Sequence, residues 1–112
     1  MLDGWNLFDD VESINAWLDD VNVRTPHEDS MRVMKVGEEY GEAVAAYIGM
    51  TGQNPRKGIT HTETDLLLEL ADVAITALCA IQHFTGDQAL TEMYLCDKIQ
   101  QIIRRIPPDE GE

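Results

Sequence analysis

The chain has little of several features that would define its class at once. It has only two cysteines, Cys79 and Cys96, among 112 residues, which is too few for a disulfide framework or a zinc site. We expect both to be reduced, buried thiols of a cytoplasmic protein. No apolar run approaches the roughly 20 residues of a membrane-spanning helix, and the first residues lack the basic and apolar regions of a secretory signal. We therefore expect neither a membrane anchor nor export.

Basic residues are also scarce, because 8 Lys and Arg face 21 Asp and Glu and leave a net charge of -13. This excess excludes proteins that grip a nucleic-acid backbone or an anionic membrane, and leaves multivalent cations and basic protein surfaces as partners. The 44 % apolar and 26 % charged residues are ordinary for a folded protein, so the acidity does not indicate disorder. We expect one domain over residues 1–112, ending in a short acidic tail at 107–112.

Proline and glycine fall at a few points and divide the chain into segments whose apolar residues recur at helical spacing. Start signals precede three of these segments: Thr25 with Glu28 in a capping box, Thr60 or Thr62 before the third, and Asp87 before the fourth. No segment alternates with period two, so we predict no strands. The expected helices cover 9–23, 26–48, 61–84 and 87–106, which predicts an all-α, four-helix bundle-like protein with short connections.

The segment 61–84 is apolar around most of its circumference, and such a helix must be buried on most sides. Three short neighbours do not suffice for that, so we expect a homodimer or homotetramer. Its polar residues gather in one narrow stripe: Asp65, Glu69, Asp72, Thr76 and His83. This stripe is either the strip that touches solvent or the wall of an internal polar site.

The segment 26–48 carries Glu38, Glu39 and Glu42 within one turn, sharing or bordering its apolar stripe. Carboxylates so close repel each other, and burying them unpaired is costly. A divalent cation between Glu39 and Glu42 on one helix and Glu69 and Asp72 on the other would remove both costs. Ligation by oxygen alone favours Mg²⁺, or Mn²⁺. Spacing by itself leaves open the alternative of solvated acidic faces with salt bridges.

The segments Glu38-Glu39-Tyr40-Gly41-Glu42 and Glu69-Leu70-Ala71-Asp72, separated by 26 residues, resemble the EExxE…ExxD signature of the MazG-like, all-α nucleoside triphosphate pyrophosphohydrolases. The resemblance covers residues 30–84. It implies a MazG-type fold and the Mg²⁺-dependent hydrolysis of a (deoxy)nucleoside triphosphate to the monophosphate and pyrophosphate. It also implies that Glu39, Glu42, Glu69 and Asp72 hold the metal, while Glu38 orients or deprotonates the attacking water.

The residues that could contact the substrate are indicated less specifically than the acidic residues of the signature. Arg56 and Lys57 lie between the two motif segments and either reach phosphate or form an ordinary basic loop. Lys35 either contacts phosphate or pairs with Glu38 or Glu39. A nucleobase would stack on Trp17 unless that side chain belongs to the core. The remaining candidates form a basic patch near the end of the chain: Lys98, Arg104 and Arg105. Many members of the resembled family have Asn four residues after a lysine there, where this chain has Ile102.

Two other functions stay open at this point. The chain is a non-enzymatic acidic helical protein, acting as a DNA mimic or as an adaptor for a basic partner, if its acids are spread over the surface. It is a lapsed family member if it binds nucleotides without hydrolysing them.

Overall fold

The structure, a computed structural model, describes residues 4–109 of the chain. Four helices occupy this range: α1 (Leu7–Val21), α2 (Pro26–Thr51), α3 (Glu63–Thr85) and α4 (Gln88–Ile103). No strand occurs among the described residues. The prediction of an all-α protein with four helices is therefore confirmed.

The expected start signals cap three of the helices. Thr62 accepts a hydrogen bond from the Asp65 backbone N–H, and the Asp65 carboxylate accepts one from the Thr62 N–H, which forms a complete capping box at α3. Asp87 caps α4 in a simpler way, through its side chain. The box predicted at α2 is only half formed: Thr25 accepts from the Glu28 N–H, but the Glu28 carboxylate binds Arg32 instead.

Several helix boundaries differ from the prediction. The first helix ends at Val21 rather than at 23, and the third begins at Glu63 rather than at 61. Three other differences have local reasons. α1 begins at Leu7 because the Asn6 side chain accepts a hydrogen bond from the Phe8 N–H and so caps the helix early. α2 continues to Thr51, where Gly52 adopts a left-handed conformation with φ of 67°. α4 ends at Ile103 because the ring of Pro107 would clash with a carbonyl of the preceding turn. Residues 110–112 of the predicted acidic tail lie outside the described residues.

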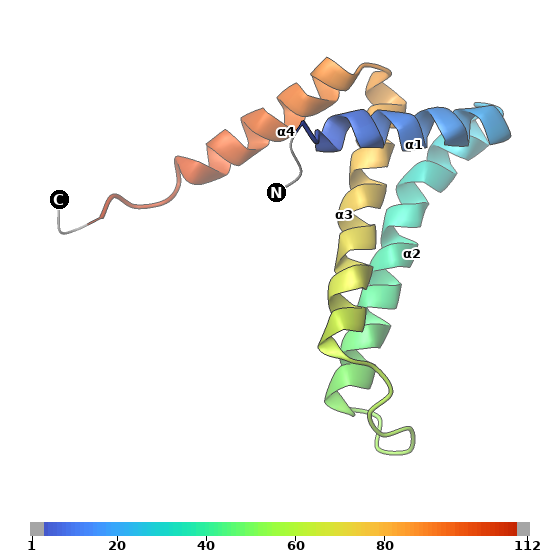
Figure 1. Ribbon diagram of the computed structural model, residues 1–112, viewed down its shortest axis with the longest axis vertical. Coiled ribbons are helices and arrows are strands. Elements are labelled where there is room, and N and C mark those ends of the chain that lie inside the picture. The colour runs from blue at the N-terminus through green and yellow to red at the C-terminus, as the bar shows by residue number, and fades with distance from the viewer. Residues whose placement is uncertain (1–3, 110–112) are drawn as a thin grey trace.

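The helices α2 and α3 run antiparallel as a long hairpin, and α1 crosses one end of it (Figure 1). Each of the other three helices contacts α3, whereas α4 leads away from the hairpin (Figure 1). The radius of gyration is 17.8 Å, compared with the roughly 13 Å expected for a compact chain of this length. The single chain is therefore extended, with α3 as its central element.

The core is small and lies where α1, α3 and the first half of α4 meet. Its buried members are Val11, Leu78 and Cys79, and Leu95 of α4 packs against them. The two cysteines differ, because Cys79 is buried as expected but Cys96 is exposed. The expectation for Cys96 was wrong because only the side of α4 that bears Leu95 turns toward the core.

None of the four helices, over the part of the chain that the structure describes, has the length and apolar character needed to cross a membrane.

Candidate metal centre

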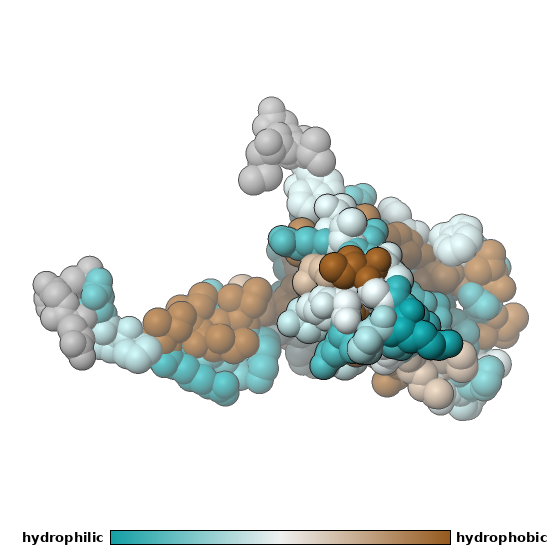
Figure 2. Space-filling view, turned by 90° about the horizontal axis from the view of Figure 1, so that it is seen from below, coloured by the Kyte–Doolittle hydropathy of each residue, from teal (hydrophilic) through white to brown (hydrophobic). Residues whose placement is uncertain are grey.

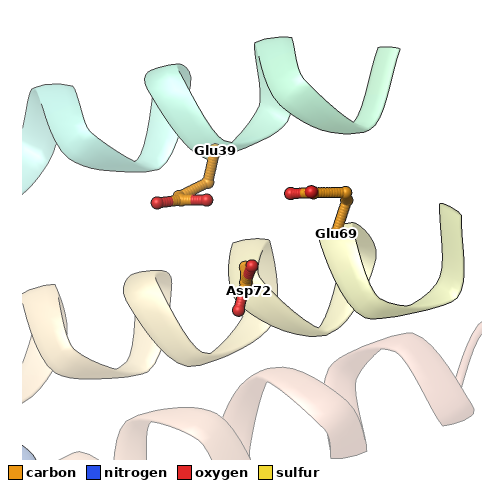
Figure 3. Close-up of side chains that lie close together, drawn as sticks. All are labelled: Glu39, Glu69 and Asp72. Carbon is orange, nitrogen blue, oxygen red and sulfur yellow. The ribbon is translucent and has the colours of Figure 1, made fainter. Parts of the chain in front are cut away.

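The hairpin of α2 and α3 brings three of the predicted carboxylates together. Glu39 of α2 and Glu69 and Asp72 of α3 each offer an oxygen, and these oxygens lie within 4.8 Å of one another. Glu39 and Glu69 point toward each other across the space between the helices (Figure 3). Both are partly buried, whereas Asp72 is exposed. Three converging oxygen donors with one open side are a ligand set that suits Mg²⁺, which keeps several waters of its own.

A buried oxygen of the Glu69 carboxylate is a second observation that points to a cation. The Oε2 atom of this residue is buried, and no described residue forms a hydrogen bond with it. Leaving a charged buried oxygen without a partner is costly, and nearby carboxylates increase that cost. A cation held between Glu39, Glu69 and Asp72 would satisfy this oxygen, so the residues present fit a metal ion.

Two other members of the predicted acidic set lie outside this group. Glu42 is exposed on α2, one turn beyond Glu39. Glu38 is next to Glu39 in sequence but has a side chain that is 57 % exposed, compared with 13 % for Glu39. Since consecutive helical residues differ by about 100° in direction, only one of these two glutamates can face α3.

Lys35 connects this region to its surroundings. Its Nζ lies 3.0 Å from Oε1 of Glu38 and 3.5 Å from Oε1 of Glu39. The hydrogen bond to Glu38, with the charge of Glu38 and then Glu39, raises the pKa of Lys35 above its usual range. The pairing interpretation of Lys35 is thus confirmed, and this lysine offsets part of the acidic charge.

A hollow of about 270 Å³ lies between α1, α2 and α3, and Lys35 lines it. Its other lining residues are largely apolar: Ile14, Leu18, Met31, Ile75, Cys79 and Ala80, with Glu28, Arg32 and Thr76 as the polar members. Burial raises the pKa of the Cys79 thiol, so this sulfur contributes as an uncharged, apolar wall. Thr76 lies one turn after Asp72 on α3, which makes the hollow a neighbour of the acidic group.

The other predicted substrate contacts do not line this hollow. Trp17 is exposed on α1 and belongs neither to the hollow nor to the core. Arg56 and Lys57 are exposed in the connection between α2 and α3. Lys98 is exposed in the second half of α4, and Arg104 and Arg105 are exposed just beyond its end. In this single chain, Lys35 is the one predicted contact that the described structure brings beside the acids.

Arg32 is a buried charge that the sequence analysis did not single out. Its guanidinium donates hydrogen bonds to Glu28 Oε2 at 2.6 Å, to Asn15 Oδ1 at 2.9 Å and to Asp19 Oδ1 at 3.1 Å. This network joins α1 to α2 and forms one wall of the hollow. The i, i+4 spacing of Glu28 and Arg32 was the available signal, but it predicts an ordinary surface pair rather than a buried junction.

His83 of α3 is a second buried polar side chain that joins two helices. Its side chain is buried, and its Nε2 lies 2.6 Å from Oδ1 of Asp29 on α2. This hydrogen bond, followed by the charges of Arg24 and of His83 itself, holds the pKa of Asp29 below its ordinary value of 3.8 against some desolvation. His83 therefore fastens α3 to α2 and takes no part in the acidic group.

Comparison of the chain with models of protein families, with curated proteins and with solved structures gave no match.

Proposed function

We propose that this protein is a Mg²⁺-dependent nucleoside triphosphate pyrophosphohydrolase with a MazG-type helical fold. The observation that carries the proposal is the convergence of Glu39, Glu69 and Asp72 from two helices, with a buried oxygen of Glu69 left without a hydrogen bond. The EExxE…ExxD pattern supports the same assignment, because these three residues are members of it. Mn²⁺ is the alternative cation, since it accepts the same oxygen ligands.

In the proposed reaction a water oxygen bonds to the α-phosphorus, and the bond between that phosphorus and the α–β bridging oxygen breaks. A nucleoside monophosphate and pyrophosphate leave, and the proton of the water passes to a base. The resemblance assigns that base to Glu38 and adds Glu42 to the metal ligands. A divalent cation supplies neutralisation of the phosphate charge, which explains how a chain of charge -13 binds a polyanion.

The hollow beside the acids supplies a place for the nucleoside. Its apolar walls, which include Met31 and Ile75, suit the faces of a base. Lys35 lines the hollow and pairs with Glu38 and Glu39, so its ammonium would contact the phosphate chain only by exchanging one of these carboxylates for it. Arg32 is less available, because its donors are engaged with Asn15, Asp19 and Glu28.

We propose a homodimer or homotetramer in the cytoplasm as the working form. The support is the large number of apolar side chains that the single chain leaves exposed, which include Leu67 and Leu68 of α3 at 56 % and 62 %. Monomeric proteins rarely expose contiguous apolar surface of this extent.

The deciding experiment is release of pyrophosphate from a panel of ribo- and deoxynucleoside triphosphates, with Mg²⁺ or Mn²⁺ and with chelator as control. We expect Mg²⁺-dependent release from at least one nucleotide, with the monophosphate as the other product. The main alternative, an acidic DNA mimic or adaptor, predicts no release and no specific response to Mg²⁺. A lapsed enzyme would bind nucleotide with Mg²⁺ and release nothing, which would contradict the proposed hydrolysis.

A further inference from the structure

The apolar face of α4 continues beyond the part of the helix that packs in its own chain. Leu95 packs against the core of Val11, Leu78 and Cys79. The same face recurs one and two turns later with Ile99, Ile102 and Ile103, which are 46 %, 49 % and 47 % exposed. Figure 2 shows this stretch of α4 as a projecting arm, hydrophobic along one side and hydrophilic along the other.

A second unpartnered apolar surface lies in the angle between the hairpin and α4. It is a hollow of about 640 Å³ whose apolar lining residues are Val33, Ala80, Ile81, Phe84, Leu90 and Tyr94. A neighbouring hollow of about 400 Å³ shares Val33 and Phe84 with it and extends to Ser30 and Asp29. Together these two hollows define a largely apolar trough that runs over α2, α3 and the first half of α4.

The chain exposes more surface area than a compact monomer of its mass, and the excess is about the area that a tightly associated dimer buries. The chain exposes 8381 Å², whereas a compact monomer of 12.6 kDa is expected to expose about 6,200 Å². The excess of roughly 2,000 Å² for each chain is the scale buried in permanent homodimers.

The charges favour a second copy of this chain as the partner. Residues 88–106, which include α4, contain three basic and two acidic side chains, whereas residues 1–87 contain five basic and sixteen acidic ones. The α4 arm itself therefore has a small positive charge and the body that bears the trough is strongly negative, whereas residues 107–112 beyond the arm add three acidic side chains. An arm that docks on the body of another copy brings opposite charges together.

We infer that a second copy of this chain covers both surfaces, and that the α4 arm of each protomer lies in the trough of the other. The exchange is reciprocal, so one two-fold axis closes it and leaves no arm free. The inference concerns the surface between copies and does not rest on nucleotide hydrolysis, so either can fail without the other.

Sedimentation velocity of the full chain tests the arm directly. We expect the wild-type chain to be a dimer, or a tetramer built from such dimers. Ile102→Lys places a charge in the buried face twice per dimer, so we expect dimerisation to weaken about 100-fold or more. The matched control is Val23→Lys, at a position that is 84 % exposed and belongs to neither surface, and we expect it to leave the assembly unchanged.

Cross-linking keeps the inference testable if Ile102→Lys fails to fold. The exposed Cys96 of α4 and a Ser30→Cys variant at the trough are treated with a short bismaleimide in a mixture of ¹⁴N- and ¹⁵N-labelled chains. We expect cross-links between residues 96 and 30 of different copies, and none between residue 96 and a Ser13→Cys control on α1. A monomeric wild-type chain, an Ile102→Lys variant that remains dimeric, or absence of the intermolecular cross-link would overturn the inference.

Discussion

Glu39 of α2 and Glu69 of α3 point toward each other across the helix interface, and Glu69 keeps a buried oxygen that no described residue satisfies. Two like charges in this position destabilise the hairpin that brings them together. The arrangement is thus unfavourable without a cation and favourable with one. This contrast between the two states makes the site testable by stability as well as by activity.

The first prediction concerns Glu69→Gln. Without divalent cations we expect this variant to be more stable than the wild type by on the order of 1 kcal/mol, because one of the converging charges is removed. Wild-type protein should gain about 2.7 kcal/mol at Mg²⁺ concentrations 100 times the dissociation constant, and the variant should gain much less. Thermal melting with and without Mg²⁺ measures both effects. A wild-type shift no larger than that in NaCl of equal ionic strength would refute the metal site.

The second prediction distinguishes the metal ligands that the geometry indicates from those that the sequence motif implies. Glu39→Gln keeps the shape of the side chain but removes a converging charge, so we expect roughly 100-fold or greater loss of Mg²⁺-dependent activity. Glu42→Gln alters an exposed residue outside the group, so we expect a smaller loss. Pyrophosphate release and titration with Mg²⁺ measure the two variants, with helical circular dichroism unchanged in both. Equal losses would instead favour the ligand set that the resemblance implies.

The third prediction is that Arg32→Met destabilises the fold by about 3 kcal/mol, because it leaves Asn15, Asp19 and Glu28 without their shared donor. The control is Arg24→Met, whose side chain is 58 % exposed and pairs with Asp29 at the surface. We expect the control to change stability by less than about 1 kcal/mol. Urea denaturation of both variants at neutral pH measures the difference, and similar values for the two would contradict a structural role for the buried network.

The fourth prediction is a pH dependence from Asp29. Because the His83 hydrogen bond lowers the pKa of this carboxyl in the folded state, its contribution to stability is complete above the ordinary value of 3.8. That contribution is lost as pH falls through the lowered folded pKa. Asp29→Asn should therefore show a shallower loss of stability between about pH 5 and pH 2. Urea denaturation across this range gives the slope, and Asp20→Asn on the exposed side of α1 is the control that should keep the wild-type slope.

The fifth prediction uses two glycines of α2. A Cβ atom at Gly49 would collide with the side chains of His61 and Thr60, whereas one at Gly41 would meet nothing within 4 Å. We expect Gly49→Ala to destabilise the fold by about 1–3 kcal/mol, because the connection to α3 must move away. Gly41→Ala should stabilise it by about 0.5–1 kcal/mol through helix propensity. Thermal melting distinguishes them, and stabilisation by both would show that the connection does not pack on α2.

Much of the secondary structure could be predicted because its signals are local. Thr62 and Asp87 cap the helices that follow them, and Gly52 ends α2, since each acts within one turn of chain. The predicted end of the last helix was wrong by about one turn because the influence of Pro107 extends backward along the helix. The N-cap at Asn6 was also missed, because α1 begins before the apolar repeat of that helix becomes evident.

The sequence by itself determined that acidic residues recur on two successive segments at spacings that allow them to meet. It also predicted that the apolar helix expected at 61–84 needs cover from a second copy. Only the tertiary structure decided which acids converge. The angular position of α2 against α3 turns Glu39 inward with Glu69 and Asp72 and leaves Glu38 and Glu42 on exposed sides. Tertiary packing likewise buried Arg32 and exposed Trp17. Each outcome depends on how one helix is rotated against another, and that rotation is set by contacts between residues far apart in the chain.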